Sequence, residues 1–562
     1  MPRVDYVTDV TSAPVSWNEQ AGPASPGAVS ANHKHSPFVN GTGGKLLTML
    51  NDARRAPRNP LGAIAAALAL GVCACTVGPD FVPPDPPTTG AYSAPDENTD
   101  IPDPGAGAPK QTVIVDQKII GDWWTLFHSH DLDELIKTAI ANNRDLAAAR
   151  ATLAQAHQTV IAAEGSFYPQ VDLNGGASRQ RVSLAAVGLN QPPTTFNLFS
   201  IGPVVSYALD PFGGTRRLVE RERAHAEFQH YQLDAAFLTL TGNTVSQAIQ
   251  IASIHSQIKV VEQIIAVDKQ TLGLIRKTRA AGSGTDADVL SAETQLAADE
   301  TVMPPLQQRL SVARHELSIL AGRAPHDWAP PSFDLAALAL PGELPQSVPS
   351  ELARQRPDIL AAEAQLHAAS ADIGIATAQL FPNITLSAAL DQESLSPGHF
   401  FDPASTLWSL ASALTAPIFH GGTLEAERKA SMEAYQASLA GYEQTTLKAL
   451  AQVANTLQAL KHDAESLRAQ SHTLDTAMAS LRLQRTKYGA GEGEILVVLD
   501  AQRQSDQANL NVVRAQAQRY LDTVQFFLAM GGGWWDTAIA DETGAGTVET
   551  AAGAKISESA AR

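Results

Sequence analysis

Two long stretches of the chain carry apolar residues at alternating steps of three and four positions. These apolar positions are Ile251, Ile254, Ile258, Val261 and Ile265 in the first stretch, and Met432, Tyr435, Leu439, Tyr442, Leu450, Val453, Leu457 and Leu460 in the second. This is the period of α-helices that pack as coiled coils. No proline occurs from Gly214 to Gly282 or from Gly422 to Gly489. Each stretch therefore predicts one helix, roughly 100 Å long at 1.5 Å per residue, which suits a rod or a tube wall better than a globule.

Shorter segments near these helices alternate between polar and apolar residues. The alternating positions are Gln170, Val171, Asp172, Leu173 and Asn174 in one segment, Asn383, Ile384, Thr385, Leu386 and Ser387 in another, and Val205, Tyr207 and Leu209 on one face of a third. Such alternation predicts β-strands with one apolar face. Strands of this kind most often cover a soluble core. Here, however, long helices flank each pair of strands, and no other element remains to cover the apolar face.

The number of predicted strands favours a barrel that is shared between chains. Four strands per chain are too few to close a barrel, which needs about eight. Strands that point apolar residues outward and polar residues inward are typical of outer-membrane barrels. Unpaired strand edges are not tolerated in lipid. The pattern therefore predicts a homo-oligomer whose chains pool their strands, without giving the number of chains.

The chain contains the same unit twice. The segment from Asp145 to Leu173 matches the segment from Asp358 to Leu386 without a gap, at an offset of 213 residues throughout. Further along, the segment from Gly282 to Ala292 matches the segment from Gly491 to Ala501. Self-similarity at a fixed period is the mark of repeated architecture. We therefore predict a duplicated unit, in which a helix, two strands, a very long helix, a turn and a helix follow one another.

Composition and charge exclude several classes of protein. Aromatic residues make up 6% of the 562 residues and hydrophobic residues 44%, which suits long, closely packed helices. The formal net charge of −18 argues against nucleic-acid binding, which needs a basic surface. The two cysteines, Cys73 and Cys75, are too close together to staple distant segments and too few for a four-cysteine zinc site. No apolar run reaches the 18 or more residues of a transmembrane helix.

Residues 49–74 have the features of a bacterial lipoprotein signal peptide. Its basic residues are Arg54, Arg55 and Arg58. The apolar stretch from Leu61 to Val72 has signal-peptide length and is too short to span a bilayer. A short buried helix is the alternative, but such helices rarely follow a basic cluster. Residues 1–48 show no periodic apolar face, so we interpret them as an N-terminal extension ahead of a start at Met49.

A lipobox ends this peptide. Ala74 suits cleavage before Cys75, whereas Val72 ahead of Cys73 suits cleavage poorly. We therefore predict a mature chain that begins at Cys75 and carries its lipid there, which is enough hydrocarbon for stable membrane anchoring. At the other end, residues 536–562 are small and polar and predict a disordered tail.

Four features together resemble the outer-membrane efflux protein family, and more narrowly its NodT/OprM-like lipoprotein branch of TolC-type channels. They are the string Cys75-Thr-Val-Gly-Pro-Asp-Phe, the string Asp122-Trp-Trp, the duplicated unit, and the closing string Gly531-Gly-Gly-Trp534. The resemblance covers residues 75–535. It implies a mixed α/β, mainly α fold: a trimer with one shared twelve-stranded barrel above a long α-helical periplasmic tunnel.

The resemblance also implies a domain division and a set of partners. A lipidated N-terminal segment spans 75–120, a first repeat 121–330 and a second repeat 345–535. The implied function is the exit duct of a tripartite efflux pump in the Gram-negative outer membrane. The implied partners are a periplasmic adaptor, an inner-membrane transporter of the proton-driven RND type and outer-membrane lipid. No enzymatic activity, nucleic acid, metal or cofactor is implied beyond the covalent lipid.

The resemblance places a gate at the turns between the long helices and their return helices. Asp288 matches an acid that bonds to a tyrosine on the facing helix, and Tyr488 stands at the tyrosine position. Asp500 matches one of two acids that ring the entrance, and a ring of carboxylates would attract cations. This sequence departs from the family at Val497, in place of the second acid, and at Gly493, in place of a basic gate residue. The alternative for both acids is that they are ordinary first-turn acids favoured by the helix dipole.

The same turns are the expected contact with the adaptor. Arg279 and Lys487 lie just before the turns, although compensation of the helix C-terminus explains them equally well. The turn glycines are Gly282, Gly284, Gly491 and Gly493. A tight reversal of direction requires glycines whatever the family, because it needs positive φ angles or close approach.

Two alternatives come from other classes of protein. A lipid-anchored periplasmic adaptor also has a coiled-coil hairpin, but it has one hairpin flanked by β-rich domains, whereas this chain has two hairpins. A structural coiled-coil stalk predicts neither the paired strands nor the duplication. Catalysis has no support, because the histidines are dispersed and no GxSxG, P-loop or HExxH string occurs.

Overall fold

The computed structural model describes residues 76–533, apart from positions 95, 98, 106, 118, 184–187 and 189–190. All described residues belong to one compact unit. The predicted N-terminal extension, the signal peptide, Cys75 and the tail at 536–562 lie outside the described residues. Among the described residues, no helix is both long and apolar enough to cross a membrane.

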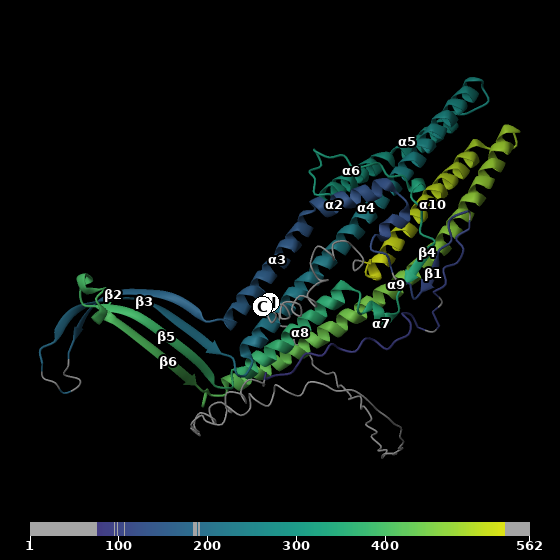
Figure 1. Ribbon diagram of the computed structural model, residues 1–562. Coiled ribbons are helices and arrows are strands. Elements are labelled where there is room, and N and C mark those ends of the chain that lie inside the picture. Colours follow the sequence, from purple (N-terminus) through teal and green to yellow (C-terminus); the bar gives the residue numbers. More distant parts are fainter. Residues whose placement is uncertain are drawn as a thin grey trace, which may run out of the picture. The chain divides into compact units, whose positions relative to one another are not determined.

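The same order of elements occurs twice, and the described part of the chain is mainly helical, as predicted (Figure 1). The first set is α3 (Arg144–Glu164), β2 (Gln170–Val182), β3 (Thr194–Leu209) and α4 (Gly214–Ala280). The second set is α8 (Pro357–Ala378), β5 (Asn383–Ser394), β6 (Thr406–Thr415) and α9 (Thr423–Gly489). α4 packs against both α3 and α8, and α8 packs against α9, so the two sets share one helical body.

The two very long helices are confirmed. α4 and α9 each span 67 residues without interruption. In α4, the predicted seam residues Ile251 and Val261 are almost fully buried. In α9, Val453 and Leu460 are fully buried, but Met432 is 44% exposed. The start of the α9 seam therefore remains uncovered within one chain.

The return helix of the first unit differs from the prediction. The second unit returns through one helix, α10 (Ile495–Ala529), as expected. The first returns through two, α5 (Asp286–Glu300) and α6 (Met303–Leu320). Pro304 and Pro305 cause the break, because proline has no backbone N–H to donate and its ring clashes with the preceding turn.

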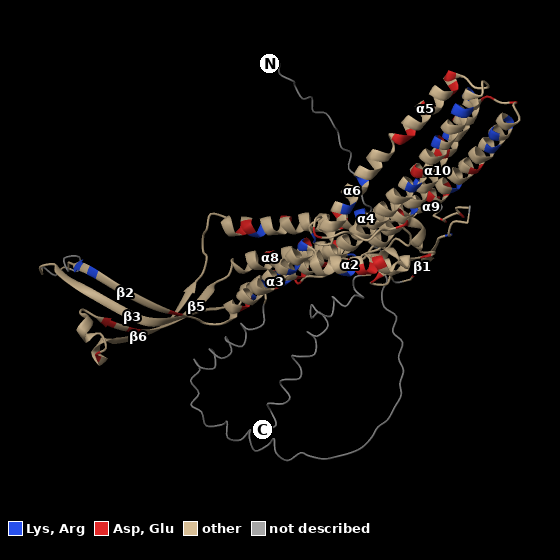
Figure 2. Ribbon diagram, turned by 90° about the horizontal axis from the view of Figure 1, so that it is seen from above, with Lys and Arg blue, Asp and Glu red and all other residues tan. Residues whose placement is uncertain are grey.

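The long strands form one antiparallel sheet in the order β2-β3-β5-β6. Residues directly opposite each other share a face. One row across the sheet is Val171, Val205, Ala388 and Leu410, and the adjoining row is Gln170, Ser206, Ser387 and Ala411. One face is therefore apolar and the other largely polar. In Figure 2 the positions of charged residues, coloured blue and red, are few on the strands and many along the helices.

A second, two-stranded parallel sheet lies at the side of the helices and joins β1 (Thr112–Val115) to β4 (Glu343–Gln346). Three short helices lie near it in the sequence: the 3-10 helix η2 (Trp123–Phe127), α2 (His130–Asn142) and α7 (Pro349–Leu352). Trp123 of η2 is fully buried and stacks on Phe527 of α10, with ring centroids 5.2 Å apart.

The two short strings that carried the resemblance meet in this core. A Cβ atom at Gly532 would lie 2.1 Å from Leu238 and 3.5 Å from the indole nitrogen of Trp123. A Cβ atom at Gly533 would lie 2.4 Å from the carbonyl oxygen of Ile120. Gly532 and Gly533 are therefore needed because the chain after α10 packs directly against the segment that contains Trp123.

Candidate functional site

The two hairpin tips, residues 281–285 and 490–494, have the same backbone hydrogen bonds. At the first tip, Gly282 donates to the carbonyl of Arg279 and Ser283 donates to that of Thr278. At the second tip, Gly491 donates to Tyr488 and Glu492 donates to Lys487. Both are Schellman motifs, which need a left-handed residue just past the helix end. Gly282 and Gly491 supply it, with φ angles of 80° and 77°.

The other two tip glycines allow close approach. A Cβ atom at Gly284 would lie 3.0 Å from the backbone nitrogen of Arg279. A Cβ atom at Gly493 would lie 3.3 Å from the backbone nitrogen of Tyr488. Gly493 therefore lets the second tip fold tightly onto the end of α9.

One apolar cluster joins the two hairpins just behind the tips. Its buried members come from α4, α5, α9 and α10 and are Leu272, Ile275, Val289, Ala292, Leu481, Ile495, Val498, Leu499 and Ala501. Tyr488 packs against this cluster and is partly buried. The hairpins therefore share a core near their tips, and any separation of the tips would expose these side chains.

Asp288 has its partner at the N-cap of its own helix, Thr285. Its backbone N–H donates to the Thr285 hydroxyl, and its carboxylate accepts from the Thr285 backbone N–H at 2.9 Å, which together make a capping box. These hydrogen bonds hold the pKa of Asp288 below its usual range. Within a single chain the carboxylate of Asp288 is thus held at the start of α5, and the structure does not join it to the hydroxyl of Tyr488.

Asp500 and Val497 lie three residues apart on α10 and are both exposed. Val497 is 46% exposed, whereas its neighbours Val498 and Leu499 are buried in the tip cluster. The carboxylate of Asp500 accepts from Arg503 at 2.5 Å and from Gln504 at 2.7 Å. The acid and the apolar side chain therefore share the outer face of α10, which no other element of the described chain covers.

The basic residues of the tips differ in their surroundings. The Nε of Arg279 forms an ion pair with Asp286 of α5 at 2.5 Å, which ties the two ends of the first tip together. Lys487 is exposed beside the second tip. The side chains of Arg279 and Asp286 are both accessible to solvent, so their ion pair contributes little to stability.

The structure also brings together three carboxyl groups that the sequence analysis did not identify. They are Asp268 of α4, Asp299 of α5 and Asp506 of α10. Asp268 is 4% exposed. Burial, together with the neighbouring carboxyl of Asp299, raises the pKa of Asp268 to about 7. Burial also raises the pKa of Asp506, to about 6. A signal for this layer exists in the sequence, because Asp268 continues the heptad seam three residues after Ile265.

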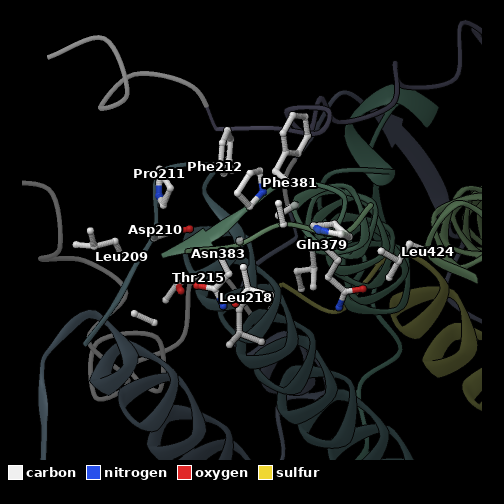
Figure 3. Close-up of a pocket in the computed structure, with 18 of the residues that line it drawn as sticks. Leu209, Asp210, Pro211, Phe212, Thr215, Leu218, Gln379, Phe381, Asn383 and Leu424 are labelled. Carbon is white, nitrogen blue, oxygen red and sulfur yellow. The ribbon is translucent and has the colours of Figure 1, made fainter. Parts of the chain in front are cut away.

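At the other end of the long helices, a cavity of about 510 Å³ lies where the strands join the helices (Figure 3). The last residue of β3, Leu209, and the next residue, Asp210, line the cavity, as does Leu424 at the start of α9. Phe212 and Phe381 stack beside it with ring centroids 4.7 Å apart. Nearby in the sequence, Ile418 and Phe419 are 96% and 86% exposed. This junction therefore presents apolar side chains around the bases of the strands.

A family model described as "Outer membrane efflux protein" matches residues 135–323 and 348–532, which is more than half of the chain. The chain belongs to this family. The efflux protein also resembles individual relatives over most of its length. The "Pyoverdine export outer membrane protein OpmQ" of Pseudomonas putida is 30% identical over 472 residues, which cover 83% of this chain and 96% of the relative.

Further relatives and solved structures support the assignment. The "Cation efflux system protein CusC" of Escherichia coli is 26% identical over 482 residues, covering 85% of this chain and 99% of the relative. The solved outer-membrane channel OprN is 28% identical, with a TM-score of 0.74 over 82% of this chain and 100% of its own. The solved structure of CusC is 25% identical, with a TM-score of 0.70 over 82% and 100% of the two chains.

These relatives decide between the functions that the sequence left open. The efflux protein is an outer-membrane channel of the kind used by tripartite pumps, rather than the periplasmic adaptor. Proteins of this family are channels, not enzymes. The family assigns this efflux protein to the Gram-negative outer membrane, with its helices forming a tunnel in the periplasm.

Proposed function

We propose that three copies of this efflux protein assemble into one exit duct, in which the four-stranded sheets close a shared twelve-stranded barrel. The observation that carries this proposal is the sheet itself. Within the described residues β2 and β6 are its outer strands and each has one unpaired edge, while the apolar rows lie on a single face. Pairing β2 of one chain with β6 of the next removes every edge, as a bilayer requires.

The duct is anchored by a lipid on Cys75 and receives its cargo from an adaptor and an RND-type transporter. Thr76, which follows Cys75 directly, lies against the turn that links β3 to α4. This turn is at the base of the sheet, so the start of the mature chain would emerge at the membrane boundary. The adaptor would contact the hairpin tips at the opposite end of the helices, through Arg279, Lys487 and the tip glycines.

The gate would lie at the same tips. Three copies of Asp500 would form a ring of carboxylates, and Val497, one helical turn earlier, would narrow the entrance by apolar contact. A bond between Asp288 and Tyr488 would require Asp288 to leave Thr285, so it belongs to an arrangement of the hairpins that differs from the one described. The names of the relatives mention pyoverdine, toluene and cations, which indicates that this fold provides the route for cargo of several kinds.

The assembly is tested in outer membranes purified from cells that express the chain. We expect an SDS-resistant, heat-modifiable trimer and discrete conductance steps in planar bilayers. Recovery of the chain only as a monomer, or only in the inner membrane, would contradict the proposal.

The anchor is tested separately by incorporation of labelled palmitate. We expect Cys75→Ser to abolish labelling, and Cys73→Ser, the matched control, to leave it unchanged. Equal labelling of both variants would remove Cys75 as the anchor and would leave the channel assignment intact.

A further inference from the structure

The first described residues of the chain, 76–81, form a segment that we call the strap. The strap lies against the start of α4 and the last turns of α8. The backbone N–H of Val77 donates to the carbonyl of Phe212 at 3.0 Å, and Phe212 lies at the cavity of the strand–helix junction (Figure 3). A Cβ atom at Gly213, whose φ is 82°, would lie 2.6 Å from the methyl carbon of Thr76. The strap is therefore packed against the turn between β3 and α4.

A single buried arginine binds the strap along its length. The side chain of Arg217 is 4% exposed. Its Nε donates to the carbonyl of Val77 at 3.2 Å, and its Nη2 donates to the carbonyl of Gly78 at 3.3 Å and to Asp80 at 2.7 Å. The carboxylate of Asp80 is 93% exposed, so solvent screens that ion pair. The bonds to the two carbonyls therefore hold the strap.

The remaining donor of Arg217 fixes the guanidinium itself. Its Nη1 donates to Glu220, one turn further along α4, at 2.7 Å. The other carboxylate oxygen of Glu220 lies 3.0 Å from Nε2 of His367 on α8. The ring of His367 in turn stacks on Phe81 of the strap, with ring centroids 4.4 Å apart. Arg217 is thus oriented from α4 and α8 before it meets the strap.

Two glycines let the strap, α8 and Arg217 pack in direct contact. Gly78 has a φ of 92°, and a Cβ atom there would lie 2.5 Å from the Cα of Gly374 on α8. A Cβ atom at Gly374 would lie 2.6 Å from the Cγ of Arg217. Any side chain at either position would push the strap away from the arginine.

We propose that Arg217 is a positioning residue for the lipid anchor, and that the strap fixes the depth at which the acylated N-terminus meets the bilayer. The inference rests on the proposed acylation of Cys75. Consecutive Cα atoms are about 3.8 Å apart, so a lipidated residue directly before Thr76 is held within one residue of the junction. The lipid then acts as a fixed part of the membrane boundary, at the level of the exposed Ile418 and Phe419, and not as a loose tether.

The depth is measured with a spin label at Ile418→Cys, since the mature chain that begins at Cys75 has no other free cysteine once Cys75 is acylated. The protein is reconstituted as the assembled, acylated channel in phosphatidylethanolamine and phosphatidylglycerol vesicles. Immersion is read from the ratio of oxygen to nickel-chelate relaxation. We expect Arg217→Lys to broaden the immersion distribution several-fold, because one ammonium nitrogen replaces the three guanidinium nitrogens that bond the strap and Glu220. The matched control Arg223→Lys concerns an exposed arginine of the same helix, which pairs with Glu164, and should leave it unchanged.

A second pair of variants separates positioning from general stability. In Cys73→Ser/Cys75→Ala, exported with a cleavable signal peptide that has no lipobox and labelled at Ile418→Cys in the same way, there is no lipid to position, so adding Arg217→Lys should cause no further broadening. Broadening of equal size with and without the acylated cysteine would show that Arg217 only stabilises the fold and would overturn the proposal. An unchanged distribution in acylated Arg217→Lys would overturn it as well. Failure of the wild type to take up palmitate would remove the lipid anchor itself, which the labelling experiment shows independently.

Discussion

The carboxyl group of Asp268 on α4 faces that of Asp299 on α5, and one oxygen of Asp268 is buried without a hydrogen-bond donor. Two carboxylates in this position repel each other unless a proton lies between them. Asp506 adds a third acid from α10; its carboxylate accepts from Gln502, and Arg485 of α9 lowers its pKa. Gln295 donates to Asp299 at 2.6 Å. The packing of the two hairpins therefore depends on protonation.

Replacing Asp268 with Asn should make the protein more stable at neutral pH. The pKa of Asp268 is about 7 in the folded chain and 3.8 for an ordinary aspartate. Because the folded state holds the proton more tightly, the wild type loses stability as pH rises from about 4 to 7 and recovers it on acidification. Asp268→Asn should remove this loss and raise the apparent melting temperature at pH 8 by several degrees, with little change at pH 4.

The comparison is made by thermal melting of the solubilised protein across that pH range. Asp475→Asn, an exposed acid on α9, is the control and should follow the wild type. If the melting temperature of the wild type rose between pH 4 and pH 7 and that of Asp268→Asn did not, the pKa of Asp268 would be lowered and not raised by folding, which would contradict the prediction.

Gly202→Val should prevent correct pairing of β3 with β5. A Cβ atom at Gly202 would lie 2.2 Å from the carbonyl oxygen of Leu390 and 2.4 Å from a carboxylate oxygen of Asp391. Overpacking of this kind costs on the order of 1–3 kcal/mol, and here the nearest atom belongs to the backbone, which cannot turn aside. We expect a strong loss of SDS-resistant assembly. Gly175→Ala, where the nearest atom is 3.8 Å away, should assemble normally, and equal behaviour of the two variants would refute the clash.

Gly491→Ala should destabilise the second hairpin tip. The φ of 77° lies in the left-handed region, where a side chain costs roughly 1–2 kcal/mol. Gly489→Ala is the matched control, because a Cβ atom there meets nothing within 4 Å and its φ is not positive. Hydrogen exchange of the amides at 486–495 should be faster in Gly491→Ala and unchanged or slower in Gly489→Ala. Identical exchange in both variants would show that the Schellman motif does not limit the stability of the tip.

Asp500→Ala should reduce the preference of the channel for cations. If three Asp500 carboxylates ring the entrance, their removal raises the relative permeability to anions several-fold, because negative charge no longer repels them. The reversal potential of single channels in a salt gradient reports this change. Gln504→Ala, which removes a hydrogen-bond partner of Asp500 without removing charge, should shift the potential far less. An unchanged reversal potential in Asp500→Ala would place Asp500 outside the ring.

Elements with local patterns could be predicted from the sequence. The heptad seam predicts α4 and α9, because the spacing of their apolar residues by three and four positions is visible in the sequence alone. The matched segments at 145–173 and 358–386 predict the repeated order of elements for the same reason. The break between α5 and α6 is local as well. Pro304 and Pro305 have no backbone N–H to donate to the preceding turn, so the sequence predicts that the helix is interrupted there.

Site residues depended on information that the sequence holds less directly. The Thr285-x-x-Asp288 spacing predicts a capping box, whereas the family resemblance implied a bond from Asp288 to Tyr488. Asp268 stands at a seam position, so a polar residue among apolar ones could have identified the acid layer. Arg217 offers no such signal, because its partners in the strap lie up to 140 residues away and two of them are main-chain carbonyls, which every residue has.

The strap comes first among the described residues, but its binding surface is completed late in the sequence. Arg217 lies 140 residues after Val77, and Gly374 lies in the second repeat, beyond the whole of α4 and its return helices. The strap can dock only after the polypeptide has been translocated at least through α8 and that helix has packed on α4. Docking of the strap onto the junction is therefore a late step of folding that joins both repeats.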